Sequence, residues 1–113
     1  MTSQCSTTSR VRALNDAFRT GGPQSGQWMH TRGVAERGAE FVILALRAVQ
    51  QFDAFDPGDD PYGEHDFGAF DLNGERLFWK IDYYDPSLSY GSNAPEDADA
   101  TSRVLTLMLA SEY

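Results

Sequence analysis

Apolar residues recur at helical spacing near the start of the chain. Val11, Leu14 and Phe18 fall on one face of a helix that we expect to begin at about Arg10, and a Gly-Gly-Pro sequence ends this helix. Residues 1–9 are rich in Ser and Thr and carry no apolar pattern, which predicts a disordered tail. The folded domain is therefore expected to begin after this tail.

A second apolar segment predicts the central helix of the fold. Residues 36–52 are apolar on nearly every side between Phe41 and Leu46, which is typical of a helix buried in the core. Between the two predicted helices, residues 26–34 alternate weakly between apolar and polar side chains. That alternation indicates a short edge strand.

The clearest local signal is an Asn-Gly pair at residues 73–74, flanked by alternating apolar and polar side chains. Both residues tolerate the positive φ of a two-residue turn, so they predict a β-hairpin with strands near 65–72 and 75–84. The turn fixes the register, and Gly68 then lies opposite Trp79, where it leaves room for the indole. The expected core face of the hairpin carries Phe70, Leu72, Leu77, Trp79, Ile81 and Tyr83.

The C-terminal segment follows a loop rich in Pro, Gly and acidic residues. Its apolar positions recur at helical spacing after possible N-caps at Asp99 and Thr101, so the pattern predicts a third helix that runs to the C-terminus. Together these elements predict an α+β fold, in which a small antiparallel sheet built on the hairpin packs against about three helices in a single domain over residues 10–113. The apolar stripe of the third helix would be Val104, Leu105, Met108 and Leu109.

Charge divides the chain into two unlike halves. The formal net charge of the 113 residues is −8. Residues 1–50 carry three acidic and six basic side chains, whereas residues 51–113 carry fourteen acidic and three basic ones. This distribution argues against direct binding of nucleic acid by the C-terminal half and allows a basic protein partner, although acidity can also serve solubility alone.

Two acidic loops flank the predicted hairpin. Residues 53–66 precede its first strand and residues 82–99 follow its second, so both loops leave the hairpin at the end opposite the Asn-Gly turn. We therefore expect one negative patch with interleaved tyrosines, which suits the arginines and lysines of a partner. The residues of this predicted patch are Asp56, Asp59, Asp60, Tyr62, Glu64, Asp66, Asp82, Tyr84, Asp85, Glu96, Asp97 and Asp99.

The sequence Glu64-His65-Asp66 leaves an enzymatic alternative open. A metal site with two histidines and a carboxylate would need His30 to approach His65 and Asp66 through the fold. Neighbouring residues of a strand point to opposite faces, so hydrogen bonds that hold the loop to the hairpin are the simpler interpretation. A calcium or magnesium site formed by Asp56, Asp59, Asp60 and Glu64 is a further alternative, although their spacing is not that of an EF-hand.

Four motifs are more specific than composition alone: VRALNDAFR, DPYGEHDFGAF, FWKIDYYD and RVLTLMLASEY. Over most of residues 10–113, these motifs resemble the domain-of-unknown-function family 3768, and only residues 21–37 depart from the pattern. The resemblance implies similarity to small accessory proteins carried on plasmids and other mobile genetic elements of bacteria.

The acidic patch and the resemblance together suggest a non-enzymatic inhibitor of a nucleic-acid-binding defence effector, such as an anti-CRISPR or anti-restriction protein. The patch would occupy the effector's DNA-binding surface, which makes the protein a DNA mimic. On this hypothesis the protein is a monomer in the cytoplasm of the bacterial host cell, with no cofactor, metal, direct nucleic-acid contact or membrane partner. The alternatives are a small metal-dependent hydrolase or nuclease that uses His65 and adjacent carboxylates, and an adaptor whose acids give only solubility.

Overall fold

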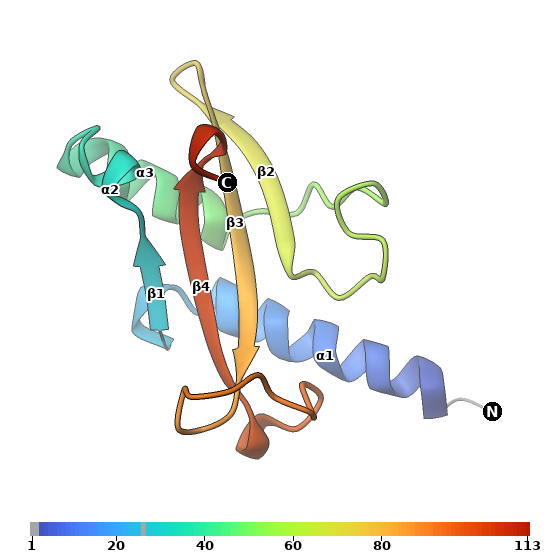
Figure 1. Ribbon diagram of the computed structural model, residues 1–113. Helices are drawn as coiled ribbons and strands as arrows, with labels where there is room; N and C mark the ends of the chain where they lie inside the picture. Colours follow the sequence, from blue (N-terminus) through green and yellow to red (C-terminus); the bar gives the residue numbers. More distant parts are fainter. Residues whose placement is uncertain (1–2, 26) are drawn as a thin grey trace.

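The computed structural model describes residues 3–25 and 27–113, which contain one four-stranded sheet. Its strands are β1 (Gln27–His30), β2 (Phe67–Leu72), β3 (Glu75–Tyr84) and β4 (Ser102–Leu109). The order across the sheet is β1-β4-β3-β2, with β1 parallel to β4 and the other neighbours antiparallel (Figure 1). The predicted α+β class is confirmed. The edge strand expected within residues 26–34 is present as β1, but residues 32–34 belong to a helix, and residue 26 lies outside the described residues.

The helices of the described residues are α1 (Ser3–Thr20), α2 (Arg32–Ala35) and α3 (Ala39–Gln50). In Figure 1, α1 and α3 both lie behind the sheet, so they cover one of its faces. Short 3-10 turns occupy Pro23–Ser25, Ala98–Ala100 and Ala110–Glu112. Among the described residues, no helix combines the length and apolar character that a membrane crossing requires.

The first helix is longer than the sequence pattern predicted. It begins at Ser3, so most of the segment expected to be a disordered tail is helical, while residues 1 and 2 lie outside the described residues. Extending an existing helix costs little because each added residue also adds a hydrogen bond. The apolar face around Val11 therefore supports a polar helical segment that has no pattern of its own.

The hairpin has the predicted register. Leu72 pairs with Glu75, Gly68 pairs with Trp79, and the turn residues at 73–74 have φ values of 51° and 81°. A Cβ atom on Gly68 would lie 2.3 Å from Nε1 of Trp79. Glycine is therefore needed at this position to admit the indole. Leu77, Trp79 and Ile81 are buried, as the predicted core face requires.

The predicted C-terminal helix is wrong, because residues 102–109 form the central strand β4. Leu105, Leu107 and Leu109 belong to the core cluster, and Val104 and Met108 on the other face are only 8 % and 5 % exposed. A strand that is buried on both faces gives a nearly continuous apolar run, which periodicity alone does not distinguish from a helix. Of the expected helix caps, Asp99 lies in the 3-10 turn Ala98–Ala100 and Thr101 is the C-cap of that turn, directly before the strand.

The core lies between the sheet and the two long helices. Leu77, Trp79, Leu105 and Leu107 of the sheet are fully buried, and Trp79 meets the ring of Phe52 edge-on. The buried residues of this core are Val34, Phe41, Ala45, Val49, Leu77, Trp79, Ile81, Leu105, Leu107 and Leu109.

Candidate partner-binding surface

A buried polar cluster joins α1, the loop before β2, and strands β3 and β4. Asn15 on α1 is fully buried. Its Nδ2 donates hydrogen bonds to the backbone oxygen of Glu64 at 2.9 Å and to the hydroxyl of Tyr83 at 2.8 Å. Its Oδ1 accepts a bond from Nε of Arg103 at 2.7 Å. One amide thus holds three separate segments together.

Tyr83 completes this cluster by donating from its hydroxyl to Oε1 of Glu64 at 2.9 Å. Burial raises the pKa of Tyr83, so the phenol stays protonated and remains a donor at physiological pH. Arg103 lies over the tyrosine ring, with Cζ 5.2 Å from the centroid, and donates to the backbone oxygen of Pro95. Burial lowers the pKa of Arg103, whereas Tyr83 and Glu64 raise it.

His65 lies in a second polar cluster, on the same side of the sheet. Its Nδ1 is 2.8 Å from Oδ1 of Asp16 on α1, and its Nε2 is 3.8 Å from Oδ2 of Asp60. The imidazole stacks on Phe55, with ring centroids 3.7 Å apart and an interplanar angle of 3°. These contacts tie the loop to α1, while the backbone oxygen of Asp66 accepts a bond from the N–H of Ile81 in β3.

The metal-site alternatives require several ligands to approach one another. Within residues 3–25 and 27–113, no three His, Cys, Asp or Glu side chains lie close enough together to hold a metal ion. His30 is exposed on the edge strand β1. The ring nitrogens of His65 face two carboxylates of the protein itself, which supports the interpretation that His65 positions the loop.

A depression of about 480 Å³ opens on the sheet face opposite the helices. Asp59, Tyr62 and Asp66 line it from the loop before β2. Lys80 and Asp82 line it from β3, and we call the hollow that these five residues line the acidic depression. Nζ of Lys80 lies 2.9 Å from Oδ2 of Asp82, and this hydrogen bond raises the pKa of Lys80. The one basic side chain of this set is therefore already paired.

Asp66 is the carboxylate of this depression that the fold stabilises least. Partial burial raises its pKa, and the neighbouring carboxylates Glu64, Asp60 and Asp82 raise it further. Among the described residues, no basic side chain forms an ion pair with Asp66. A hydrogen bond from the backbone of Asp66 itself lowers this pKa in part, so in the described part of the chain its negative charge has a local hydrogen bond but no opposite charge paired with it.

The acidic segment between β3 and β4 uses several of its carboxylates to hold turns. Oδ1 of Asp85 accepts bonds from the hydroxyl of Ser87 at 2.9 Å and the backbone N–H of Ser89 at 3.0 Å, which lower the pKa of Asp85. Oδ1 of Asp97 accepts from the backbone N–H of Asp99 at 2.9 Å. These acids stabilise the local backbone.

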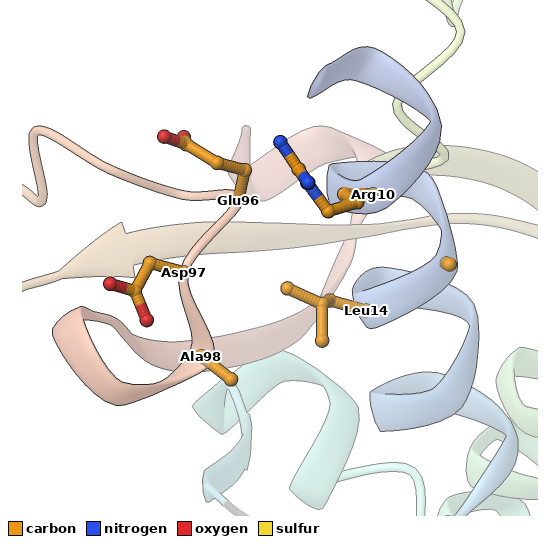
Figure 2. Close-up of a pocket in the computed structure, with 6 residues that line it drawn as sticks. Arg10, Leu14, Glu96, Asp97 and Ala98 are labelled. Carbon is orange, nitrogen blue, oxygen red and sulfur yellow. The ribbon is translucent and has the colours of Figure 1, made fainter. Parts of the chain in front are cut away.

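A second depression, of about 510 Å³, lies between α1 and this segment. Figure 2 shows Arg10 and Leu14 projecting from α1 toward the segment, whereas the carboxylates of Glu96 and Asp97 turn away from the helix. The two depressions share no lining residue. Of the acidic side chains expected to form one patch, Asp59, Asp66 and Asp82 line the first depression, and Glu96 and Asp97 line the second.

The twelve residues of the predicted patch differ in their access to a partner. Asp60 is only 8 % exposed and accepts the backbone N–H of His65 at 3.1 Å. Six others, Glu64, Asp66, Asp82, Tyr84, Asp85 and Glu96, are partly buried. The exposed ones are Asp56, Asp59, Tyr62, Asp97 and Asp99.

The polar residues of α1 were not predicted as part of any site. Asn15 and Arg19 follow Val11 at intervals of four residues, so they continue the buried face of the helix. Arg19 is 3 % exposed, donates to the backbone oxygen of Val49 at 3.1 Å, and lies over the rings of Phe55 and Trp79. Polar residues at these apolar positions were the signal that could have revealed the cluster.

Comparison with known proteins gives one match. Residues 30–112 match the model of a family described as "Protein of unknown function (DUF3768)". The chain belongs to this family. No curated protein and no solved structure matches the chain. The DUF3768 match contains Glu64, His65, Tyr83 and Arg103 but not α1, so the polar clusters join the matched segment to a helix outside it.

Proposed function

We propose that the protein binds a basic protein surface through the acidic depression. The observation that carries the proposal is the position of Asp66, which has no ion-pair partner among the described residues and lies beside Asp59 and Asp82 in an open hollow. An arginine or lysine from a partner would supply the missing ion pair, and the ring of Tyr62, which is 80 % exposed, offers apolar and cation–π contact. The acidic depression is therefore suited to basic side chains.

The partner class we propose is a nucleic-acid-binding defence effector, whose DNA-binding surface the protein would occupy. Two features support this choice. Residues 51–113 carry fourteen acidic and three basic side chains, which gives the long-range field that guides a basic partner. The resemblance of the family to accessory proteins of mobile elements supports an inhibitory role against host defence.

Two alternatives differ from this proposal in a measurable way. A hydrolase that uses His65 would rely on Nε2, because Nδ1 is bonded to Asp16 at 2.8 Å, and it would lose its activity in His65→Ala. A protein whose acids give only solubility would respond to total charge and not to the position of each charge. A test should therefore place the same charge change at different positions on the surface and compare the effects on binding.

The experiment is a binding measurement between the tagged protein and purified CRISPR and restriction effectors, repeated at raised salt and with DNA as competitor. The variants are Asp59→Lys and Tyr62→Ala, both at exposed positions of the acidic depression. The matched control is Asp71→Lys, which makes the same charge change beside the hairpin turn, where Asp71 is exposed. Circular dichroism confirms that each variant is folded.

The proposal expects binding that DNA displaces and that raised salt weakens. Asp59→Lys should weaken it by about tenfold or more, because a like charge then faces the partner's basic surface. Asp71→Lys should change it little. Equal losses in the two lysine variants would favour a non-specific effect of net charge. Failure to bind any effector would remove the proposed partner class.

A further inference from the structure

The outer face of α3 carries an exposed stripe that the rest of the chain does not cover. Ile43 is 56 % exposed and Leu44 is 37 % exposed, although the opposite side of the same helix lies in the core. Glu40 precedes this pair by one turn and Arg47 follows it by one turn, and both are exposed. Residues at these four positions share one face of a helix. We call them the α3 stripe.

The charges at the two ends of the α3 stripe have no oppositely charged partner in residues 3–25 and 27–113. Among the described residues, neither Glu40 nor Arg47 forms an ion pair. The two are seven positions apart on one helix, which separates them by about 10 Å along the axis, too far for them to pair with each other. The stripe thus presents an apolar centre between a free negative end and a free positive end.

We propose that a second copy of this chain covers the α3 stripe, with the two α3 helices antiparallel about a two-fold axis. An axis that passes between positions 43 and 44 sets Ile43 against Leu44 of the second copy. The same axis sets Glu40 against Arg47 of the second copy, and the symmetry makes each contact twice. The stripe is therefore complementary to itself: its apolar residues meet apolar residues, and its charges meet opposite charges.

Orientation follows from the same positions. Parallel packing in register would set Glu40 against Glu40 and Arg47 against Arg47, which is unfavourable at both ends. Antiparallel packing removes both repulsions and also opposes the two helix dipoles favourably. The charge order of the stripe thus selects one arrangement of the two copies.

The expected dimer is weak and leaves the acidic depression free. A contact of one helix pair falls in the smallest class of interfaces, below about 1,200 Å² in total, so its population should depend on concentration. Because α3 packs on the sheet face opposite the acidic depression, the dimer would present two acidic depressions to solvent. The proposal replaces the monomer expected from the sequence, and it stands independently of the proposed function.

Sedimentation velocity from micromolar to near-millimolar concentration tests the proposal. The wild-type chain should shift toward dimer mass as concentration rises. Glu40→Arg and Arg47→Glu each set two like-charge pairs across the axis and should weaken the dimer by about tenfold or more. The double variant Glu40→Arg/Arg47→Glu restores opposite charges and should recover dimerisation. Asp53→Arg, which makes the same charge change at an exposed loop position, is the control and should leave the dimer unchanged.

Three results would overturn the proposal. The first is a monomer at every concentration. The second is a dimer that the single variants do not weaken. The third is a double variant that dimerises no better than the single ones, since exchange of the charges should restore the contact whatever each substitution does alone. Folding of each variant is checked by its circular dichroism spectrum.

Discussion

Replacement of Asn15 by alanine should destabilise the protein strongly, because this side chain makes three buried hydrogen bonds. Two are neutral, to the backbone oxygen of Glu64 and the hydroxyl of Tyr83, and the third is donated by the charged Arg103. Neutral bonds contribute about 0.5–1.5 kcal/mol each and charged ones about 1.5–3 kcal/mol, so the expected loss is about 2.5–6 kcal/mol. Arg103, which is 8 % exposed, would lose the acceptor of its Nε without a replacement, whereas Tyr83 would keep its bond to Glu64.

This loss is large relative to the whole stability of a small domain, which is typically about 5–15 kcal/mol. Urea denaturation followed by far-ultraviolet circular dichroism measures it as a change in the free energy of unfolding. Asn93→Ala removes the same amide from an exposed position and is the matched control. A loss of about 1 kcal/mol or less in Asn15→Ala would refute the view that this amide holds the loop, β3 and β4 together.

Two further predictions concern packing and pH. Gly68→Ala should lower the free energy of unfolding by about 1–3 kcal/mol in thermal or chemical denaturation, since its Cβ would lie 2.3 Å from Nε1 of the fully buried Trp79. Gly91→Ala is the control that should be tolerated, because the nearest atom to its Cβ would be 3.8 Å away. Asp66→Asn should raise the free energy of unfolding at pH 7, because the raised pKa of Asp66 means that its ionised form is disfavoured in the folded state. This gain in stability should vanish as the pH falls below 3.8, the ordinary pKa of an aspartate, because the carboxyl group is then protonated in both the folded and the unfolded state. Asp53→Asn, at an exposed carboxylate, should give little gain at either pH, and an equal gain from both variants would contradict the assignment.

The hairpin was predictable because its signals are local. The Asn-Gly turn at residues 73–74 defines a register without reference to the rest of the chain, and the alternation on either side agrees with it. The space beside Gly68 could likewise be inferred from the pairing alone. Local sequence and tertiary contacts specify the same arrangement here.

Strand β4 was not predictable from its own residues. Leu105 and Leu107 pack toward the helices, while Val104 and Met108 are buried on the other face. Whether this apolar run forms a helix or a strand depends on the segments that pair with it, and one of these is β1, more than seventy residues earlier in the sequence. The apolar run therefore carried the information that the segment is central, but not the information that it is a strand.

The acidic loops show a similar limit for the candidate site. Sequence supplies the number of carboxylates but not their contacts, and the structure shows that Asp60, Asp85 and Asp97 accept hydrogen bonds from nearby backbone N–H groups. Such acids stabilise turns and would be present with or without a partner. Among the described residues, the carboxylate of Asp59 makes no such bond, and that of Asp66 has only one to its own backbone, so these two acids are the ones best placed to bind a partner.

The polar residues of α1 explain why the loop before β2 contains both acids that stabilise turns and an acid that has no ion-pair partner. The loop of sixteen residues between α3 and β2 contains no helix or strand, and Asn15 and Asp16 hold its last residues against α1 through Glu64 and His65. Once these contacts hold one side of the loop against the helix, the neighbouring Asp66 is placed on the open face of the sheet beside Asp82. The buried clusters therefore position an unpaired carboxylate, and an unfavourable charge held in place in this way is the feature that a basic partner would relieve.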